Sequence, residues 1–262
     1  MRPEFFIAAF ENTRYHRFGR VPDAGARLRV AARVVSEDAD EVRMHVQVLS
    51  DFVHKSGTIL QKDIVHNETT VRMTPRVPVP PRIPVAGPQR GAIDLPDPYL
   101  LPGSNVLLKG PFAAMDEVAV GSSRRFARYR FARSLQGTAQ FEAMLPNLVC
   151  MDAFWRFGTV QLIDRNTLGV YVPERCGVMH VYFDYLAFQW PDLLETLTFE
   201  GENPRIDGDL LHVGPIRVRD AKGNTLLEVM QGVCRKYGEV KMEAESSFEE
   251  MIAEAEYGVP RL

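Results

Sequence analysis

The stretch from Leu148 to Gly158, LVCMDAFWRFG, decides the fold. Most of its residues suit a buried helix, and Pro146 before it and Gly158 at its end follow a common asymmetry of helix termini. We therefore predict a helix over 145–158. Asp152 stands in its middle, and a carboxylate in an apolar element is costly unless it is paired or used.

Two interpretations of Asp152 follow from its neighbours. Arg156 is four residues later, so both side chains share one helix face and can form an ion pair. Alternatively, Asp152 is an acid beside an apolar tunnel, where it handles a proton. Burial by the flanking apolar residues raises the pKa of a carboxyl group, whereas Arg156 opposes that rise. These flanking residues are Met151, Phe154, Trp155 and Phe157.

Composition excludes several classes of protein. The net charge of the 262 residues is -3, which gives no general affinity for nucleic acid or anionic membranes. No apolar run of about 18 residues predicts a membrane span, and the first residues do not resemble a secretory signal. Cys150, Cys176 and Cys234 have no paired or metal-like spacing, so we expect reduced thiols in a cytoplasmic protein.

The pattern along the chain predicts an α+β protein with two units. Polar and apolar residues alternate over 27–35 and 41–49, and 64–73 is rich in Val, Thr and Ile, as expected for antiparallel strands. In chain order, we predict a strand-rich first unit at 1–74, a proline-rich connector at 75–104, a second unit at 105–240 and a helical tail at 241–262.

The second unit is predicted to be one helix followed by an antiparallel meander. Ala221 to Asn224 has the composition of a hairpin turn. The arginine-rich strand over 124–131 could hold a phosphate, but we expect it to form a solvated sheet face. The strands predicted after the helix are 169–173, 178–188, 193–200, 209–219 and 225–236.

None of the six histidines has a metal-ligand spacing, so we predict no metal site. Patterns of nucleophile elbows, phosphate loops and dinucleotide folds are also absent from the sequence. The histidines are expected to be strand or loop residues, and they are His16, His45, His54, His66, His180 and His212.

Four stretches resemble motifs of polyketide synthase dehydratase domains. Pro146 to Ala153 is similar to the Pro-x-Leu-Leu-Asp-Ala stretch of the second hotdog in that family. Tyr171 to Pro173, followed by Gly177 to His180, resembles its Leu-Pro-Phe and Gly-Val-x-Leu-His strands. Lys109 to Phe112 resembles its Tyr-Gly-Pro-x-Phe turn. The segment 209–236 resembles its closing hairpin.

This resemblance implies a double hotdog, in which a curved antiparallel sheet wraps a long helix. The first unit, Phe5 to Met73, resembles only the last strands of a first hotdog, so that hotdog is incomplete at its N-terminal end. The implied activity is that of a hydro-lyase of polyketide or fatty-acyl biosynthesis. It removes water from a β-hydroxyacyl thioester, which arrives on the phosphopantetheine of an acyl carrier protein, and it needs no other cofactor.

The resemblance assigns Asp152 as the general acid. It also assigns tunnel-lining roles to Arg156, Trp155, Gly110, Pro111, Tyr171 and Pro173. Two residues depart from the family pattern. The family's catalytic histidine has no counterpart among the six histidines, and Arg156 stands where the family has Gln or His. An arginine there favours the ionised form of Asp152, which is the wrong state for a proton donor.

Several explanations of the missing histidine stay open. The chain is a fragment of a longer dehydratase, or it works with a separate chain that supplies the base. It could also be a non-catalytic hotdog that binds acyl chains or supports a synthase, or a cyclase or isomerase variant that uses the acid alone. An incomplete first hotdog leaves apolar sheet uncovered, so we expect a homodimer or an assembly with other synthase domains or subunits.

Overall fold

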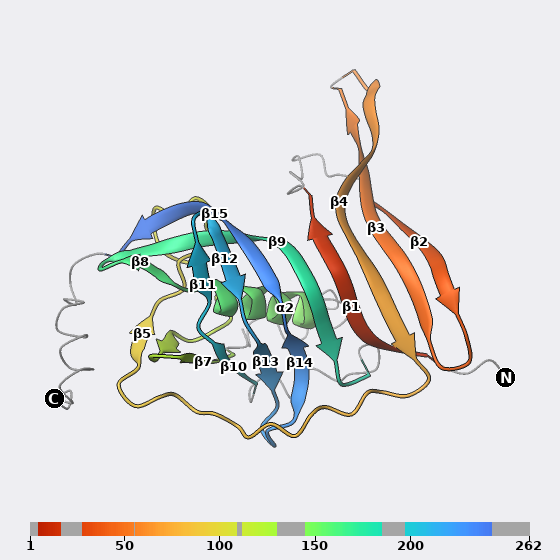
Figure 1. Cartoon of the computed structure of the whole chain (residues 1–262). Coiled ribbons are helices and arrows are strands. Elements are labelled where there is room, and N and C mark those ends of the chain that lie inside the picture. Colours follow the sequence, from red (N-terminus) through yellow and green to blue (C-terminus); the bar gives the residue numbers. More distant parts are fainter. Residues whose placement is uncertain are drawn as a thin grey trace.

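The computed structural model describes residues 5–16, 28–54, 56–108, 112–129, 145–184 and 197–242. These ranges contain one helix, α2 (Leu145–Thr159), and one sheet of fifteen strands that curves around it (Figure 1). Within them, no helix combines the length and apolar character that crossing a membrane requires. The strands are β1 (Phe6–Tyr15), β2 (Leu28–Glu37), β3 (Val42–Val53), β4 (Ile59–Thr74), β5 (Ile93–Leu95), β6 (Val118–Val120), β7 (Arg124–Arg128), β8 (Leu162–Asp164), β9 (Thr167–Val181), β10 (Thr198–Glu202), β11 (Arg205–Asp207), β12 (Leu210–Val213), β13 (Ile216–Arg219), β14 (Thr225–Val229) and β15 (Gly232–Lys241).

The first unit consists of β1 to β4 in the order β2-β3-β4-β1. All three strands predicted there are confirmed, and the described part of this unit contains no helix. It joins the second unit where β1 pairs with β9 in antiparallel orientation. One continuous sheet therefore runs from β2, on the right in Figure 1, through β1 and β9 to the strands around α2.

One row of directly paired residues shows how the solvent exposure of one sheet face changes from strand to strand. Val34, Met44, Val71, Phe10 and Met179 are consecutive partners on β2, β3, β4, β1 and β9. Paired residues in antiparallel strands point to the same face, so the row follows a single face. Val34 is 50% exposed at one end, whereas Val71 and Met179 are 9% and 8% exposed. The face that covers α2 in the second unit therefore continues across the first, and its side chains become exposed towards β2.

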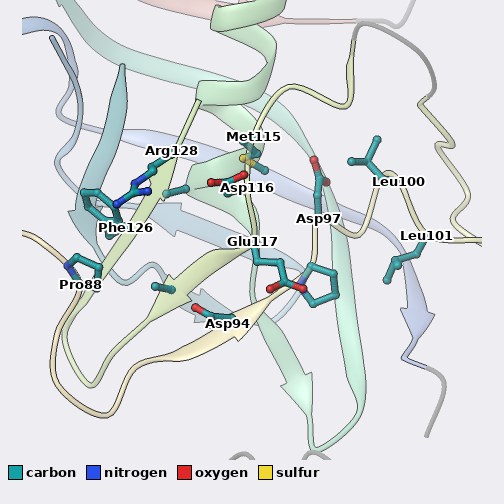
Figure 2. A pocket seen from close by; sticks show the side chains of 13 residues that line it. Pro88, Asp94, Asp97, Leu100, Leu101, Met115, Asp116, Glu117, Phe126 and Arg128 are labelled. Carbon is teal, nitrogen blue, oxygen red and sulfur yellow. The ribbon is translucent and has the colours of Figure 1, made fainter. Parts of the chain in front are cut away.

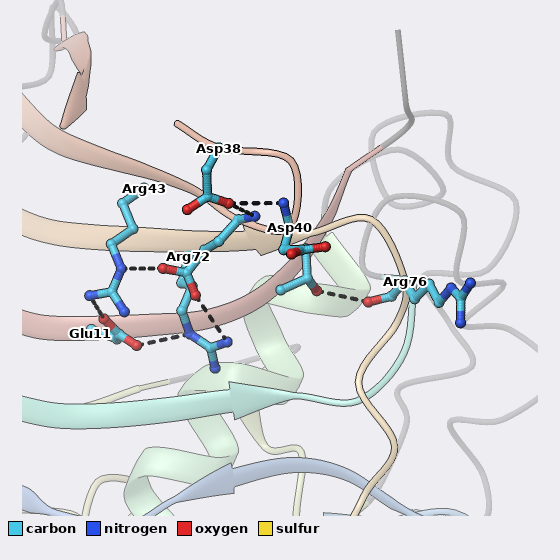
Figure 3. Close-up of polar contacts among 8 residues, drawn as sticks. Glu11, Asp38, Asp40, Arg43, Arg72 and Arg76 are labelled. Carbon is cyan, nitrogen blue, oxygen red and sulfur yellow. Dashed lines mark hydrogen bonds and ion pairs between the residues drawn. The ribbon is translucent and has the colours of Figure 1, made fainter. Parts of the chain in front are cut away.

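The opposite face of the first unit is polar. The Glu11 carboxylate accepts hydrogen bonds from Arg43 Nη1 at 3.1 Å and from Arg72 Nε at 3.0 Å, so it links three neighbouring strands (Figure 3). Surface pairs of this kind contribute little stability individually. Their presence identifies which side of the first unit faces water.

Helix α2 lies on the concave face of the second unit because its aromatic residues pack into that sheet. Phe154 and Phe157 are fully buried, and their ring centroids lie 5.7 and 5.6 Å from that of Phe199 on β10. Gly158 permits close approach near the helix end, since a Cβ atom there would lie 3.0 Å from side-chain carbons of Ile216 and Val213. The predicted helix is confirmed.

Strand boundaries in the second unit differ from the sequence prediction. The two strands predicted at 169–173 and 178–188 are one strand, β9, which ends at Val181; of the predicted remainder, 185–188 lies outside the described residues. Glu174 and Arg175 interrupt the apolar pattern, but ladders with β15 and β1 hold them extended. The strands predicted at 209–219 and 225–236 are each divided in two.

The connector at 75–104 is attached to the second unit along its length. Its first part has no regular structure and follows the lower edge of the molecule in Figure 1. There the Ala86 amide donates to Glu200 Oε2 at 3.0 Å, and Glu200 pairs with the buried Arg219 at 2.6 Å. Its second part supplies β5 to the sheet and Tyr99 to the core. The predicted helical tail falls mostly at 243–262, outside the described residues.

Arg125 on β7 corrects the prediction that the arginines of the strand over 124–131 form a solvated sheet face. Its side chain points inward and is 2% exposed. Nη1 donates hydrogen bonds to the carbonyl oxygens of Phe157 and Val160 at 2.9 and 2.8 Å, and Nη2 donates to Gln161 Oε1 at 3.0 Å. The last carbonyls of a helix have no partner within the helix, and Arg125 satisfies those at the end of α2.

Replacing Arg125 with Met should destabilise the protein by about 2–3 kcal/mol, because buried carbonyl groups at the helix end lose a charged donor. Urea denaturation measures the change. The matched control is Arg124→Met on the exposed side of the same strand, which should remain close to wild type. Equal stability of the two variants would contradict the capping role.

Candidate active site

Asp152 lies midway along α2, and its side chain is 34% exposed. Arg156 Nε donates a hydrogen bond to Asp152 Oδ2 at 2.7 Å, so the predicted pair along the helix is confirmed. Asp152 is thus neither a fully buried acid nor a surface group. One side of its carboxyl group contacts the guanidinium, and part of it remains open to solvent.

Arg156 makes two further contacts that the sequence did not indicate. Its side chain is only 4% exposed, and it forms an ion pair with Asp97, whose side chain is 3% exposed. Nη2 donates a hydrogen bond to the carbonyl oxygen of Phe112 at 2.6 Å. The guanidinium is therefore held between the helix, the end of the connector and the segment before β6.

Burial dominates the electrostatics of this cluster. It raises the pKa of Asp152 to about 6 and lowers the pKa of Arg156 to about 10. The sequence predicted that burial would raise the pKa of Asp152 and that Arg156 would oppose the rise, and in the folded chain the effect of burial is the larger. At a pKa of about 6, Asp152 exchanges its proton close to the pH at which a general acid works best.

Two buried tyrosines lie near enough to Asp152 to respond to its charge. Burial raises the pKa of Tyr99 and of Tyr129, and the Asp152 carboxylate adds to both shifts. The Tyr99 hydroxyl accepts a hydrogen bond from the Tyr171 amide at 3.0 Å, donates to the Tyr171 carbonyl and lies 3.4 Å from Thr159 Oγ1. Tyr99 thereby connects the helix end to β9.

The other predicted site residues have different positions. Trp155 meets Tyr15 of β1 edge-on, with ring centroids 6.4 Å apart, so it links α2 to the first unit. Tyr171 is fully buried on β9, and Pro173 is half-buried two residues further on. Gly110 and Pro111 lie outside the described residues. The structure therefore brings Asp152, Arg156 and the Tyr171 backbone into one network.

Each of the six histidines interacts with a residue other than Asp152. His16 and His45 approach Glu68, at 3.0 and 3.7 Å, on the polar face of the first unit. The remaining contacts are His54 with Ser56, His66 with Ser50, His180 with Tyr182 and His212 with Asp207. Among the described residues, no group of His, Cys, Asp and Glu side chains could hold a metal ion.

A cavity of about 820 Å³ adjoins this network at Asp97 (Figure 2). Asp97 both lines the cavity and pairs with Arg156, whereas Asp152 is not part of the lining. Four of the lining side chains are acidic and one is basic. The lining residues are Pro88, Asp94, Pro96, Asp97, Leu100, Leu101, Met115, Asp116, Glu117, Ala119, Phe126, Ala127 and Arg128.

The sequence analysis missed Asp97, Tyr99 and Tyr129. Asp97 and Tyr99 fall in a segment that its prolines identified as a connector, although Leu95, Tyr99, Leu100 and Leu101 give that segment an apolar character. Asp97 Oδ1 accepts the Tyr99 amide at 3.0 Å, a local turn contact typical of aspartate. An apolar cluster around an aspartate was the available signal.

No family model and no curated protein matches the sequence. Solved structures do match the fold. The N-terminal dehydratase of the difficidin assembly line has a TM-score of 0.59 at 13% identity, over 98% of this chain and 84% of that one. The bifunctional dehydratase-cyclase domain of ambruticin biosynthesis has a TM-score of 0.57 at 15% identity, over 88% and 76% of the two chains. The PpsC dehydratase domain from Mycobacterium tuberculosis, in complex with C12:1-CoA, has a TM-score of 0.52 at 17% identity, over 88% and 75%.

The chain shares the hotdog fold of polyketide synthase dehydratase domains, and its described residues contain one hotdog helix, α2. The predicted α+β class is confirmed, and so, at the level of the fold, is the resemblance of its motifs to these domains. Asp152 is the carboxylic acid in the part of α2 that carried that resemblance.

The raised pKa of Asp152 predicts a specific pH dependence of stability. The folded state binds this proton more tightly than the unfolded state, so its stabilising effect is complete below pH 3.8 and is lost as the pH rises to about 6. Relative to Asp152→Asn, the wild type should lose roughly 1–2 kcal/mol over that interval, allowing for solvent screening of a partly exposed group. Urea denaturation at several pH values measures this difference. Parallel stability curves for the two proteins would contradict the raised pKa.

Proposed function

We propose that the chain is a dehydratase-type domain that removes water from a β-hydroxyacyl thioester carried on an acyl carrier protein. The observation that carries the proposal is Asp152, an acid with a pKa raised to about 6 on the helix of a dehydratase fold. The complex of the PpsC domain with an acyl-CoA supports an acyl thioester as the substrate class.

Asp152 acts in this proposal as the general acid. A base takes the proton on the carbon next to the thioester carbonyl, and the electrons of that bond form the new double bond. The bond between the β-carbon and its hydroxyl breaks, and the Asp152 proton joins the leaving hydroxyl to form water. Arg156, Trp155, Gly110, Pro111, Tyr171 and Pro173 keep their proposed lining roles.

The base is assigned to a partner chain or to chain outside the described residues. Each of the six histidines contacts a residue other than Asp152, which supports a base that comes from elsewhere. The free and buried cysteines Cys150, Cys176 and Cys234 support a reducing, cytoplasmic location.

Asp152→Asn should abolish water loss from a 3-hydroxyacyl thioester, by at least about 100-fold, because general acid catalysis contributes factors of that size. The assay follows formation of the unsaturated thioester by mass spectrometry. It is run with and without the protein encoded by the adjacent gene, which is tested as the separate chain that supplies the base. Asp207→Asn, at an exposed position on β11, is the matched control. Unchanged turnover by a folded Asp152→Asn protein would remove the enzymatic proposal.

Because each histidine contacts a residue other than Asp152, a second candidate function is also favoured. It is a non-catalytic hotdog that binds acyl chains or supports a synthase. It predicts binding of an acyl thioester without turnover, even when the neighbouring gene product is present. A cyclised or isomerised product in the same assay would instead indicate the variant reaction. The dehydratase-cyclase among the matched structures is an example of a domain with both activities.

We further infer that the chain self-associates or joins other synthase subunits through the uncovered apolar face of the first unit. This face presents Val30 and Val34 on β2, and they are 70% and 50% exposed. Their strand partners Val48 and Met44 extend it. Exposed apolar surface of this extent commonly marks an interaction site.

Sedimentation velocity at micromolar concentration should therefore find the wild type in an assembly larger than a monomer. The double substitution Val30→Glu and Val34→Glu should raise the dissociation constant about tenfold or more, since it buries charge in an apolar contact. Arg33→Glu, on the opposite face of β2, serves as the control. A monomeric wild type, alone and with its neighbouring gene product, would contradict the inference.

A further inference from the structure

We propose that Asp97 is a positioning residue for the acid: it balances the charge of Arg156 and so leaves Asp152 able to keep its proton. This inference rests on the proposed function of Asp152 as the proton donor. Asp97 belongs to the connector and lies 55 positions before Asp152 in the chain. The fold alone brings the two carboxyl groups to the same guanidinium.

The contacts account for the whole Arg156 side chain. Nε donates to Asp152, Nη1 pairs with Asp97, and Nη2 donates to the Phe112 carbonyl. The cluster thus contains one cation and two carboxyl groups. With both ionised it would carry a net charge of -1 in a largely dry site. Two carboxylates that share one site raise the pKa of one of them, because the cluster becomes neutral when a single proton stays.

The structure indicates which carboxyl group keeps that proton. Asp97 is almost fully buried; its Oδ1 accepts a hydrogen bond from the Tyr99 amide, and its Oδ2 forms the ion pair with Arg156. A hydrogen bond and an adjacent cation both favour the charged form of a carboxyl group, so the proposal takes Asp97 as the anion of the pair. Asp152 receives a donor at Oδ2 among the described residues and is more open to solvent. It is therefore the member of the pair that exchanges a proton.

The groups that surround the cluster also favour a protonated Asp152. Tyr99 from the connector and Tyr129 after β7 face Asp152, and burial keeps both phenols neutral at physiological pH. Cys150 lies on the same helix, and its pKa is also raised by burial. The cavity beyond Asp97 is lined by Asp94, Asp116, Glu117 and Arg128, so its charge is more negative than positive (Figure 2). Arg156 is thus the cation in direct contact with Asp152.

Asp97→Asn tests the proposal in the full-length chain. With Asp97 neutral, the Arg156 charge acts on Asp152 alone, and the titration midpoint of Asp152 should fall by at least about one pH unit. The midpoint is measured from the ¹³C shift of the Asp152 carboxyl group, assigned with Asp152→Asn. Asp94→Asn removes an acid from the same cavity and should leave the midpoint within about 0.3 units, since its distance from the cluster weakens the effect.

A double variant keeps the test valid if Asp97→Asn does not fold. Asp97→Asn with Arg156→Gln removes one negative and one positive charge together, and the Asp152 midpoint should then equal or exceed the wild-type value. A midpoint below wild type in the double variant would overturn the proposal. So would an unchanged midpoint in a folded Asp97→Asn protein.

The pH profile of water loss separates this proposal from the proposed function. Asp97→Asn should reduce turnover at pH 7 about tenfold, because a pKa one unit lower leaves only about one tenth as much protonated Asp152 as in the wild type at that pH. It should also move the pH profile to lower pH together with the NMR midpoint. A shifted midpoint in a protein that never turns over its substrate would support the role of Asp97 and refute the enzyme. An unshifted midpoint in an active enzyme would refute the role of Asp97 and support the proposed function.

Discussion

The candidate site depends on one buried charge, the guanidinium of Arg156. An ion is stable in an apolar interior only when nearby groups of opposite charge and hydrogen-bonding groups replace the water it has lost. Asp97, Asp152 and the Phe112 carbonyl make that replacement. Because these groups come from the helix, the connector and the segment before β6, the charge also fixes the relative positions of three parts of the chain.

The same requirement applies elsewhere in the second unit. Arg125 satisfies the carbonyl groups at the end of α2, and Arg219 with Glu200 anchors the connector to the outer face of the sheet. Arg125 and Arg219 therefore each join an irregular or terminal segment to a strand, whereas Arg156 joins two such segments to the helix. The first unit differs, because its charged residues form partly buried pairs on one sheet face and its apolar face has no helix among the described residues.

Local pattern was enough to predict the elements but not the long-range contacts. The helix followed from its apolar residues, Pro146 and Gly158. Two strands of the first unit followed from a period of two, and a third from its Val, Thr and Ile content. Motifs at 146–153 and 171–180 were sufficient to identify the hotdog fold. The Asp152–Arg156 pair was predictable because both residues lie on one helix. Asp97 was not, since only the folded chain brings it to Arg156, and the inward direction of Arg125 depends on where the end of α2 lies.

The central claim is that Asp152 holds a proton inside the folded protein, and its carboxyl infrared absorption is the most direct measurement. At about pH 5, one unit below its pKa of about 6, the wild type should show a protonated-carboxyl band that Asp152→Asn lacks. This band should disappear as the pH rises above about 6. Identical spectra of the two proteins at about pH 5 would show Asp152 already ionised, and the account of it as a proton donor would be wrong.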